Sequence, residues 1–165
     1  EKKDKILCAK YRKGHFEGVL DVMDRLTNLI KPSKIFMGKK DYQQLFLVKN
    51  FIEKKYRTKV IGCKTIRDKN KLAFSSRNIH LNKNELYQAG KISTEILLLK
   101  KKFSKSKNIK KLITQKRKEL INSFNIKCDY FELRNILNLK ISNKVKYSKL
   151  FIAYYINKVR LIDNF

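Results

Sequence analysis

The sequence predicts an α/β protein in two parts, an incomplete parallel sheet with helices followed by a small α+β domain. Between residues 17 and 63 the hydrophobic pattern runs helix, strand, helix, strand, an order typical of a parallel, doubly wound sheet. After residue 64 a polar loop is followed by two amphipathic helices and short alternating runs, which is typical of helices beside an antiparallel sheet. We therefore expect one domain over residues 1–64 and a second over residues 65–165.

The first helix is predicted over residues 17–30, after an approach loop or short strand at residues 1–16. Its apolar residues recur at intervals of three and four, which places them in one stripe. The stripe consists of Val19, Val22, Met23, Leu26, Leu29 and Ile30. Lys31-Pro32-Ser33 ends the helix because proline cannot continue it.

Two short strands are predicted at Ile35–Met37 and Lys59–Cys63, with a helix at Asp41–Tyr56 between them. That helix is apolar almost all round, so we expect it to be buried between layers. Two strands alone do not make a stable sheet of this class. We therefore expect further strands upstream of Glu1, and we interpret the sequence as part of a longer protein.

The second part is expected to hold helices at residues 84–102 and 107–123, with the lysine-rich stretch Lys100–Lys111 as a loop between them. Three short runs then alternate in hydrophobicity and predict a small antiparallel sheet. These runs are Cys128–Arg134, Leu150–Ile156 and Val159–Ile162. Asn157-Lys158 joins the last two as a hairpin.

The net charge of +27 normally suggests a nucleic-acid partner. However, only 8 of the 41 basic residues are arginine, the side chain on which specific readers of nucleic acid depend. Lysine, asparagine and isoleucine are abundant, and all three have AT-rich codons. We interpret the charge as compositional bias, with the lysines mostly on solvated faces. A basic nucleic-acid-binding module remains the alternative function.

The three cysteines, Cys8, Cys63 and Cys128, are far apart and form no metal-binding pattern. We expect reduced, mostly buried thiols, no disulfide framework and no protein-bound metal. The sequence has no apolar stretch of about 18 residues and no secretory pattern at its start, so we expect neither a membrane span nor export. These features indicate a cytoplasmic protein.

The run from Gly38 to Leu45 lies at a strand-to-helix junction, where glycine permits a sharp turn and a helix start offers free N–H groups. Lys39 and Lys40 beside that start favour an anion, while Asp41 and the amides that follow can hold hydroxyl groups. Taken one at a time, these residues have ordinary explanations. The glycine could serve only the turn, and the aspartate could be only a helix cap. Ser75-Ser76-Arg77 could be a plain polar loop.

Three motifs in this order resemble the pantoate–β-alanine ligases, and the resemblance covers nearly the whole chain. They are Gly14-His15-Phe16-Glu17-Gly18-Val19, Gly38-x-Lys40-Asp41-Tyr42-Gln43-Gln44-Leu45 and Ser75-Ser76-Arg77-Asn78, followed by the tail Arg160-Leu161-Ile162-Asp163-Asn164. The resemblance implies a Rossmann-like nucleotidyltransferase domain, a smaller C-terminal domain and an active site between them. It also implies a cytoplasmic homodimer. Its reaction joins pantoate to β-alanine with Mg-ATP through a pantoyl adenylate, releasing AMP and pyrophosphate.

The resemblance also implies roles for individual residues. Asp41 would bind the ribose hydroxyls, Lys40 a phosphate, and Gln44 pantoate. Lys40 and Arg77 would stabilise the charge that develops during adenylate formation. The expected ATP-binding residues are Gly38, Lys39, Lys40, Asp41, Ile66, Phe74, Ser75, Ser76 and Arg77, of which Ile66 would meet the adenine through its backbone and the last four would form a closing loop.

The chain departs from the family pattern at several places. Lys39 replaces the usual glutamate, Asn70-Lys71 replaces the usual Asp-Gly, and Phe74 replaces a smaller aliphatic residue. The family's histidine-rich phosphate motif, with its proposed general acid, and its first pantoate-binding glutamine lie outside these 165 residues. We therefore expect the chain to be inactive and poorly folded when made alone. A decayed enzyme that still binds ATP is a further alternative.

Overall fold

The computed structural model describes residues 5–106 and 108–165. The chain divides into two compact units, Glu1–Thr65 and Ile66–Phe165. The first unit has a parallel pair of strands with helices, and the second has an antiparallel sheet with helices, so the predicted α/β class is confirmed. Of the first predicted segment, residues 1–4 lie outside the described part of the chain, as does residue 107, where the last predicted helix begins.

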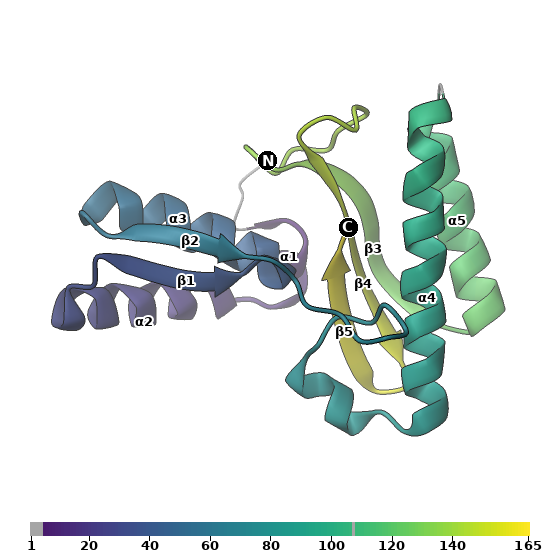
Figure 1. The fold of residues 1–165 in the computed structure, drawn as a ribbon, viewed down its shortest axis with the longest axis horizontal. Helices are drawn as coiled ribbons and strands as arrows, with labels where there is room; N and C mark the ends of the chain where they lie inside the picture. The colour runs from purple at the N-terminus through teal and green to yellow at the C-terminus, as the bar shows by residue number, and fades with distance from the viewer. Residues whose placement is uncertain (1–4, 107) are drawn as a thin grey trace. The chain divides into compact units, whose positions relative to one another are not determined.

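The sheet of the first unit consists of strands β1 (Lys34–Gly38) and β2 (Lys59–Cys63), paired in parallel in the described part of the chain. Helix α3 (Tyr42–Lys55) connects them and packs on one face of the sheet (Figure 1). The small core between helix and sheet is formed by Leu45, Val48, Ile52 and Val60. Alternation along the strands explains this core, because only every second side chain points toward α3.

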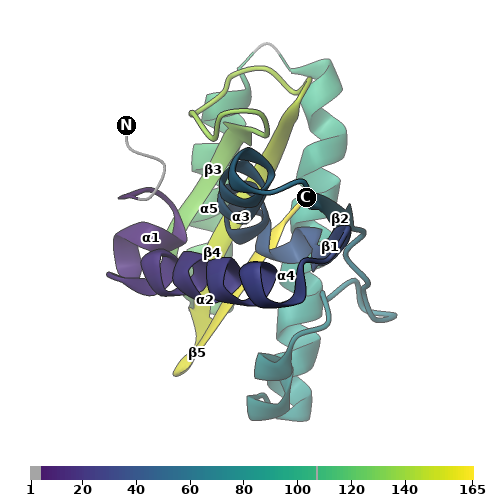
Figure 2. The same ribbon diagram turned by 90° about the vertical axis from the view of Figure 1, so that its left-hand side faces the viewer.

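Helix α2 (His15–Ile30) lies beside α3 (Figure 2) and ends where Lys31 adopts a left-handed conformation with φ 50°. The predicted helix is confirmed, but only part of its apolar stripe is buried. Val19, Leu20 and Met23 pack against the core of the unit. The rest of the stripe, Val22, Leu26, Leu29 and Ile30, is exposed, with Leu29 at 80%.

Two further expectations for the first unit were wrong. A short helix, α1 (Cys8–Tyr11), replaces the predicted loop or strand. Helix α3 is not apolar all round, since its polar side is exposed. Large apolar side chains are exposed on the strands of this unit instead. They include Phe36 of β1, at 66% exposure, and its register partner Ile61 of β2, at 37%.

The second unit contains the predicted antiparallel sheet, with strands β3 (Lys127–Asn135), β4 (Ser148–Ile156) and β5 (Val159–Asn164) in that order (Figure 1). The hairpin between β4 and β5 is confirmed. Ile156 pairs with Val159 across it, and Asn157 takes the left-handed conformation that asparagine tolerates, with φ 49°.

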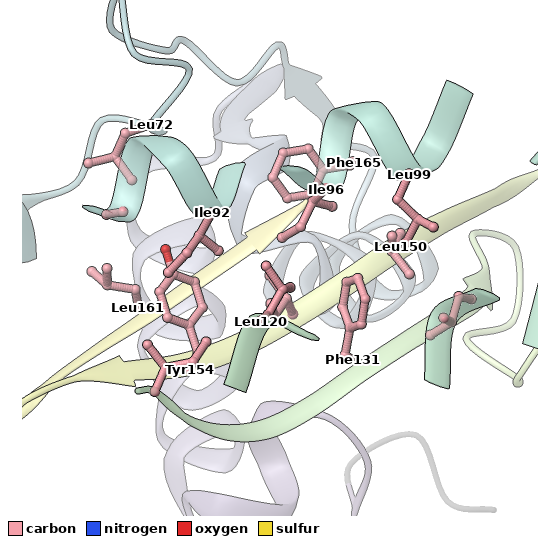
Figure 3. Close-up of a cluster of buried hydrophobic side chains, with 14 of the residues drawn as sticks. Leu72, Ile92, Ile96, Leu99, Leu120, Phe131, Leu150, Tyr154, Leu161 and Phe165 are labelled. Atoms are coloured by element: carbon pink, nitrogen blue, oxygen red, sulfur yellow. The ribbon is translucent and has the colours of Figure 1, made fainter. Parts of the chain in front are cut away.

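Helices α4 (Lys83–Lys102) and α5 (Ile109–Phe124) pack together and against this sheet. Asn82 and Glu85 form a reciprocal capping box at the start of α4. Figure 3 shows the buried cluster that joins the layers, which includes Ile92 and Ile96 of α4 together with Phe131 and Leu150 of the sheet. Residues 100–102 continue α4 and are followed by the 3₁₀ turn η4 (Phe103–Lys105), so the expected lysine-rich loop is shorter than predicted.

The cysteines differ from one another in exposure. Cys8 is buried and Cys128 half-buried, but Cys63 is exposed at the end of β2. Burial raises the pKa of the Cys128 thiol above its ordinary value. A membrane-crossing helix would have to be long and apolar, and no helix in the described ranges meets both conditions.

Candidate functional site

The first group of expected site residues lies at the carboxyl ends of β1 and β2, where Gly38 pairs with Cys63. Ligands of open α/β sheets bind at this edge. The 3₁₀ turn η2 (Lys39–Asp41) follows directly and leads into α3. Gly38 itself has φ −68° and ψ 132°, which any residue adopts, and an added Cβ would meet nothing within 4 Å. The expectation that the turn needs glycine is therefore wrong for the described chain.

Lys40 and Asp41 lie side by side at the start of α3. The Lys40 ammonium is 3.6 Å from the Asp41 carboxylate, and the two side chains are 17% and 50% exposed. Asp41 makes no side-chain hydrogen bond that caps the helix, so its ordinary explanation as a cap is not supported. Its carboxylate instead points into accessible space beside a half-buried cation.

Lys39 turns toward the neighbouring strand. A Cβ added at Gly62 of β2 would lie 3.0 Å from Lys39 Cε and 2.9 Å from Leu45 Cδ2. The glycine thus permits the stem of Lys39 and the leucine to approach the strand closely. Lysine can occupy this position, where the family resemblance implies glutamate, because its aliphatic stem covers the backbone of β2.

The two adjacent glutamines of the motif have different surroundings. Gln43 is buried; its Oε1 accepts a 3.0 Å hydrogen bond from Cys8 N, and its Nε2 donates a 2.8 Å bond to Ile6 O. These bonds hold the start of α1 and the residues before it against α3. Gln44 is half-buried, and its side chain makes none of the side-chain hydrogen bonds found in the described part of the chain. Gln44 is therefore the one that can serve a ligand.

The start of α3 has the electrostatics of an anion site. The first turn of α3 carries no acidic residue, and the one carboxylate at its start, that of Asp41, lies 3.6 Å from the Lys40 ammonium, which offsets its charge. The two lysines of η2 add full positive charges directly before the helix. A phosphate group is the chemistry that this arrangement favours.

The second group of expected site residues lies in the second unit, on the polar loop before α4. Phe74 N donates a 3.1 Å hydrogen bond to Ile66 O, and Arg67 pairs with Ala73 in an isolated antiparallel bridge. These bonds place Ile66 and Phe74 together, although seven residues separate them on either side of a tight turn. Both side chains are exposed.

The 3₁₀ turn η3 (Ser76–His80) follows immediately and carries the Ser-Ser-Arg motif. Ser75 Oγ accepts a 3.3 Å bond from Arg77 N at the start of η3. Arg77 Nη1 donates to Arg160 O of β5 at 2.9 Å, which occupies one of the five N–H groups of the guanidinium. Ser76 and His80 are exposed. Asn78 Nδ2 donates to Ala73 O at 3.1 Å and ties η3 back to the bridge.

Sequence reasoning missed the ion pair that holds this loop. Arg67 binds Asp163 of β5 through two hydrogen bonds, Nη1 to Oδ2 at 2.6 Å and Nη2 to Oδ1 at 2.9 Å. Burial raises the pKa of the neighbouring Tyr154 hydroxyl, and the charge of Asp163 raises it further. No local pattern reveals a pair separated by 96 residues, although Asp163 lies within the quoted tail motif.

The turn itself has one strained residue. Lys71 has φ 69°, a conformation that favours glycine. Lysine stands here where the family resemblance implies glycine, and at this positive φ its side chain carries a conformational cost that glycine would not. Asn70 lies against α4, since a Cβ added at Gly90 would be 2.6 Å from Asn70 Cβ and 2.9 Å from Asn70 O.

Comparison with known proteins identifies the family. The profile described as Pantoate-beta-alanine ligase matches residues 1–165. The chain belongs to the pantoate–β-alanine ligase family. A pantothenate synthetase from Flavobacterium psychrophilum is 38% identical over 162 residues, covering 94% of this chain and 56% of the relative. One from Clostridium botulinum is 40% identical over 166 residues, covering 96% and 58%. This membership does not favour the nucleic-acid-binding alternative.

Solved structures agree with this family. The pantothenate synthetase of Thermus thermophilus matches with a TM-score of 0.91 at 26% identity, covering 99% of this chain and 60% of that one. A pantoate–β-alanine ligase from Francisella tularensis, complexed with beta-gamma ATP and beta-alanine, matches with a TM-score of 0.74 at 34% identity, covering 100% and 55%. The chain therefore spans somewhat more than half the length of the relatives that it matches.

Proposed function

We propose that these 165 residues form part of an ATP-dependent ligase that condenses pantoate with β-alanine to give pantothenate, AMP and pyrophosphate. Family membership over the whole chain supports this most strongly. The carboxylate of pantoate would attack the α-phosphate of ATP, giving pantoyl adenylate and releasing pyrophosphate. The amine of β-alanine would then attack the activated carbonyl and displace AMP. Both steps need the substrates held in place and negative charge stabilised, rather than a covalent group from the protein.

The first unit would supply the groups that hold ribose, phosphate and pantoate. Lys40 would bind phosphate, because it is cationic, half-buried and next to the dipole of α3. Asp41 would accept hydrogen bonds from the ribose hydroxyls through its exposed carboxylate. Gln44 would hold pantoate with its unengaged amide, while Gly38 and Lys39 would bring the backbone close to the nucleotide.

The second unit would supply a loop for the rest of the nucleotide. The Ile66 carbonyl already accepts from Phe74 N, so its backbone would contact adenine through the N–H or through the second lone pair of the oxygen. Ser75 and Ser76 would donate neutral hydrogen bonds to phosphates. Arg77 would add charge stabilisation through the donors that its contact with Arg160 O leaves unused.

Mg²⁺ would enter as part of the substrate Mg-ATP. Among the residues that the structure describes, no group of three or more His, Cys, Asp or Glu side chains could hold a metal ion. Mg²⁺ is commonly held by substrate phosphates with few protein ligands, which fits this composition. We further propose that the complete enzyme is a cytoplasmic, Rossmann-like homodimer, as the family resemblance implies, with no specific nucleic-acid partner.

We test the role of Lys40 with Lys40→Ala in the complete polypeptide that contains these residues. Loss of one preorganised cation should reduce kcat for pantothenate formation by about 100- to 1000-fold. Lys49→Ala is the matched control, since Lys49 lies on α3, the helix that directly follows the turn of Lys40, is half-exposed and pairs only weakly with Glu53 at 3.7 Å. Its turnover should stay within about twofold of wild type. A Lys40→Ala enzyme within tenfold of wild type would remove Lys40 from the mechanism.

A second variant tests the nucleotide path at Gly38. Gly38→Ala should leave stability unchanged, because the added methyl group meets no described atom and the backbone angles suit alanine. If ATP passes over this backbone, the methyl should raise KM for ATP by about tenfold, the size of a modest steric penalty in a binding site. An unchanged KM would place the nucleotide elsewhere.

A further inference from the structure

We propose that Arg67 and Asp163 are positioning residues for ATP, acting through the loop that carries Ile66 and residues 74–77. This inference rests on the proposed function. It assigns a role in nucleotide binding to an ion pair that touches no expected ligand atom directly. The loop would keep its shape for ATP only while strand β5 holds both of its ends.

The near end of the loop is held by a four-bonded guanidinium. Besides its two bonds to Asp163, Arg67 donates from Nη1 to Lys71 O at 2.9 Å and from Nη2 to Asn164 O at 3.2 Å. The Arg67 guanidinium carbon also lies 4.5 Å from the centre of the Phe165 ring, which the buried cluster in Figure 3 includes. The Arg67 guanidinium thus contacts the turn at Lys71, strand β5 and the Phe165 ring at the same time.

The far end of the loop is held by the same strand. Arg77 donates to Arg160 O, and Arg160 in turn binds Asp129 of β3 at 2.8 Å. Residues 160 and 163 are about 10 Å apart along β5 at the usual rise per residue. Strand β5 therefore fixes two separate points of a loop of about ten residues.

The position of Arg67 determines where Ile66 and Phe74 lie, because backbone hydrogen bonds connect the three residues. Arg67 belongs to the bridge with Ala73, and the next hydrogen bond outward joins Phe74 N to Ile66 O. A displacement of Arg67 would therefore move Ile66 and Phe74 together, and with them the start of the Ser-Ser-Arg turn. Misplacement of binding groups by about 1 Å can cost as much as 100-fold in rate.

Burial makes the pair sensitive to replacement by similar residues. The side chains of Arg67 and Asp163 are 19% and 7% exposed, so little water can replace a lost bond. Lysine at position 67 would keep the charge but could not bridge the carboxylate, Lys71 O and Asn164 O at once. Arg67→Lys thus removes the simultaneous hydrogen bonds to Asp163, Lys71 O and Asn164 O while keeping the positive charge beside the carboxylate.

The experiment compares Arg67→Lys, Asp163→Asn and the double variant in the complete polypeptide. KM for ATP should rise about tenfold in each single variant, while KM for pantoate stays within twofold. The double variant should be no worse than the more affected single variant, since both residues act through one contact. A merely structural role would lower the amount of folded enzyme, and hence apparent kcat, with both KM values unchanged.

Arg134→Lys is the matched control. Arg134 is buried, pairs with Glu132 at 2.7 Å and donates to Leu139 O at 2.7 Å, so it holds a different loop of the same sheet. Its replacement should lower the unfolding temperature without changing KM for ATP. Equal changes in KM for ATP in Arg134→Lys and Arg67→Lys would overturn the positioning role.

Wild-type activity separates this inference from the proposed function. If the wild-type enzyme makes no pantothenate, the proposed function fails, and direct titration with ATP decides the positioning role. An ATP Kd about tenfold weaker in Arg67→Lys than in wild type and in Arg134→Lys would support the role. A wild type that binds no ATP, or variants with unchanged Kd, would overturn it.

Discussion

The same substitution, glycine to alanine, should have opposite effects at two helical positions of this chain. Gly18 lies in α2, and a Cβ added there meets nothing within 4 Å. Gly90 lies in α4, where an added Cβ would be 2.6 Å from Asn70 Cβ and 2.9 Å from Asn70 O. Neither glycine needs a positive φ. The difference in outcome therefore depends on packing rather than on backbone conformation.

The magnitudes follow from two opposing effects. Alanine is better than glycine in a helix interior by about 1 kcal/mol. At Gly18 this gain stands alone, so Gly18→Ala should stabilise its unit by about 0.5–1 kcal/mol. At Gly90 the methyl group must displace the turn at Asn70, and such overpacking costs about 1–3 kcal/mol. Gly90→Ala should therefore destabilise its unit by about 1 kcal/mol after the helix gain is subtracted.

The assay measures amide hydrogen exchange at increasing urea concentrations. It gives the free energy of unfolding separately for α2 and α4, which matters because the two units need not unfold together. The change in the free energy of unfolding, measured for each variant against the same unit of the wild-type protein, should differ by about 2 kcal/mol between the two variants. Thermal midpoints should shift by about 4–8 °C for each kcal/mol in units of this size. If Gly90→Ala stabilises as much as Gly18→Ala, the close approach of the turn to α4 is refuted.

Three further predictions follow from single contacts. Lys71→Gly should stabilise the chain by about 0.5–1 kcal/mol by relieving its positive φ, as urea unfolding would show; a lower stability would contradict the strained turn. Gln43→Ala should destabilise the first unit by about 2 kcal/mol, as its two buried hydrogen bonds are lost, whereas Gln44→Ala should leave the unfolding midpoint unchanged and raise KM for pantoate. A hydrogen bond from Lys55 lowers the pKa of Asp24, so the pair's stabilisation is present above the ordinary carboxyl pKa and lost as pH falls through the lowered value; Asp24→Asn should flatten the acid limb of a stability–pH curve, and an unchanged limb would exclude the pair.

The order of elements was predictable because periodicity reports secondary structure locally. The helices at 15–30 and 83–102 and the final hairpin all carry their own start or stop signals, such as Pro32, Asn82 and Asn157. The burial of α2 was not predictable in the same way. A stripe of apolar residues shows which side of a helix can be buried, not how much of it meets a partner within this chain.

The candidate site was predictable where the residues are close in sequence and not where distant segments meet. The Gly-Lys-Lys-Asp run lies at a sheet edge and helix start, as a strand–turn–helix pattern requires. The family resemblance singled out Gln44, but local pattern alone could not distinguish it from Gln43, because only the fold shows which of these adjacent helical residues meets the segment at Ile6. Asp163 was visible only as part of a motif until the fold placed it against Arg67.

The exposed face of the parallel strand pair has a consequence for how this polypeptide behaves in solution. Phe36 and Ile61 form an apolar patch beside the outer edges of β1 and β2, which pair with no other strand among the residues that the structure describes, and this combination promotes self-association. Mutual repulsion between molecules of charge +27 opposes such contacts at low ionic strength. Because the screening length falls from about 10 Å at 0.1 M salt to about 3 Å at 1 M, added salt should precipitate this chain rather than dissolve it. Colloidal stability here would depend on the lysine excess that gives the chain its charge of +27.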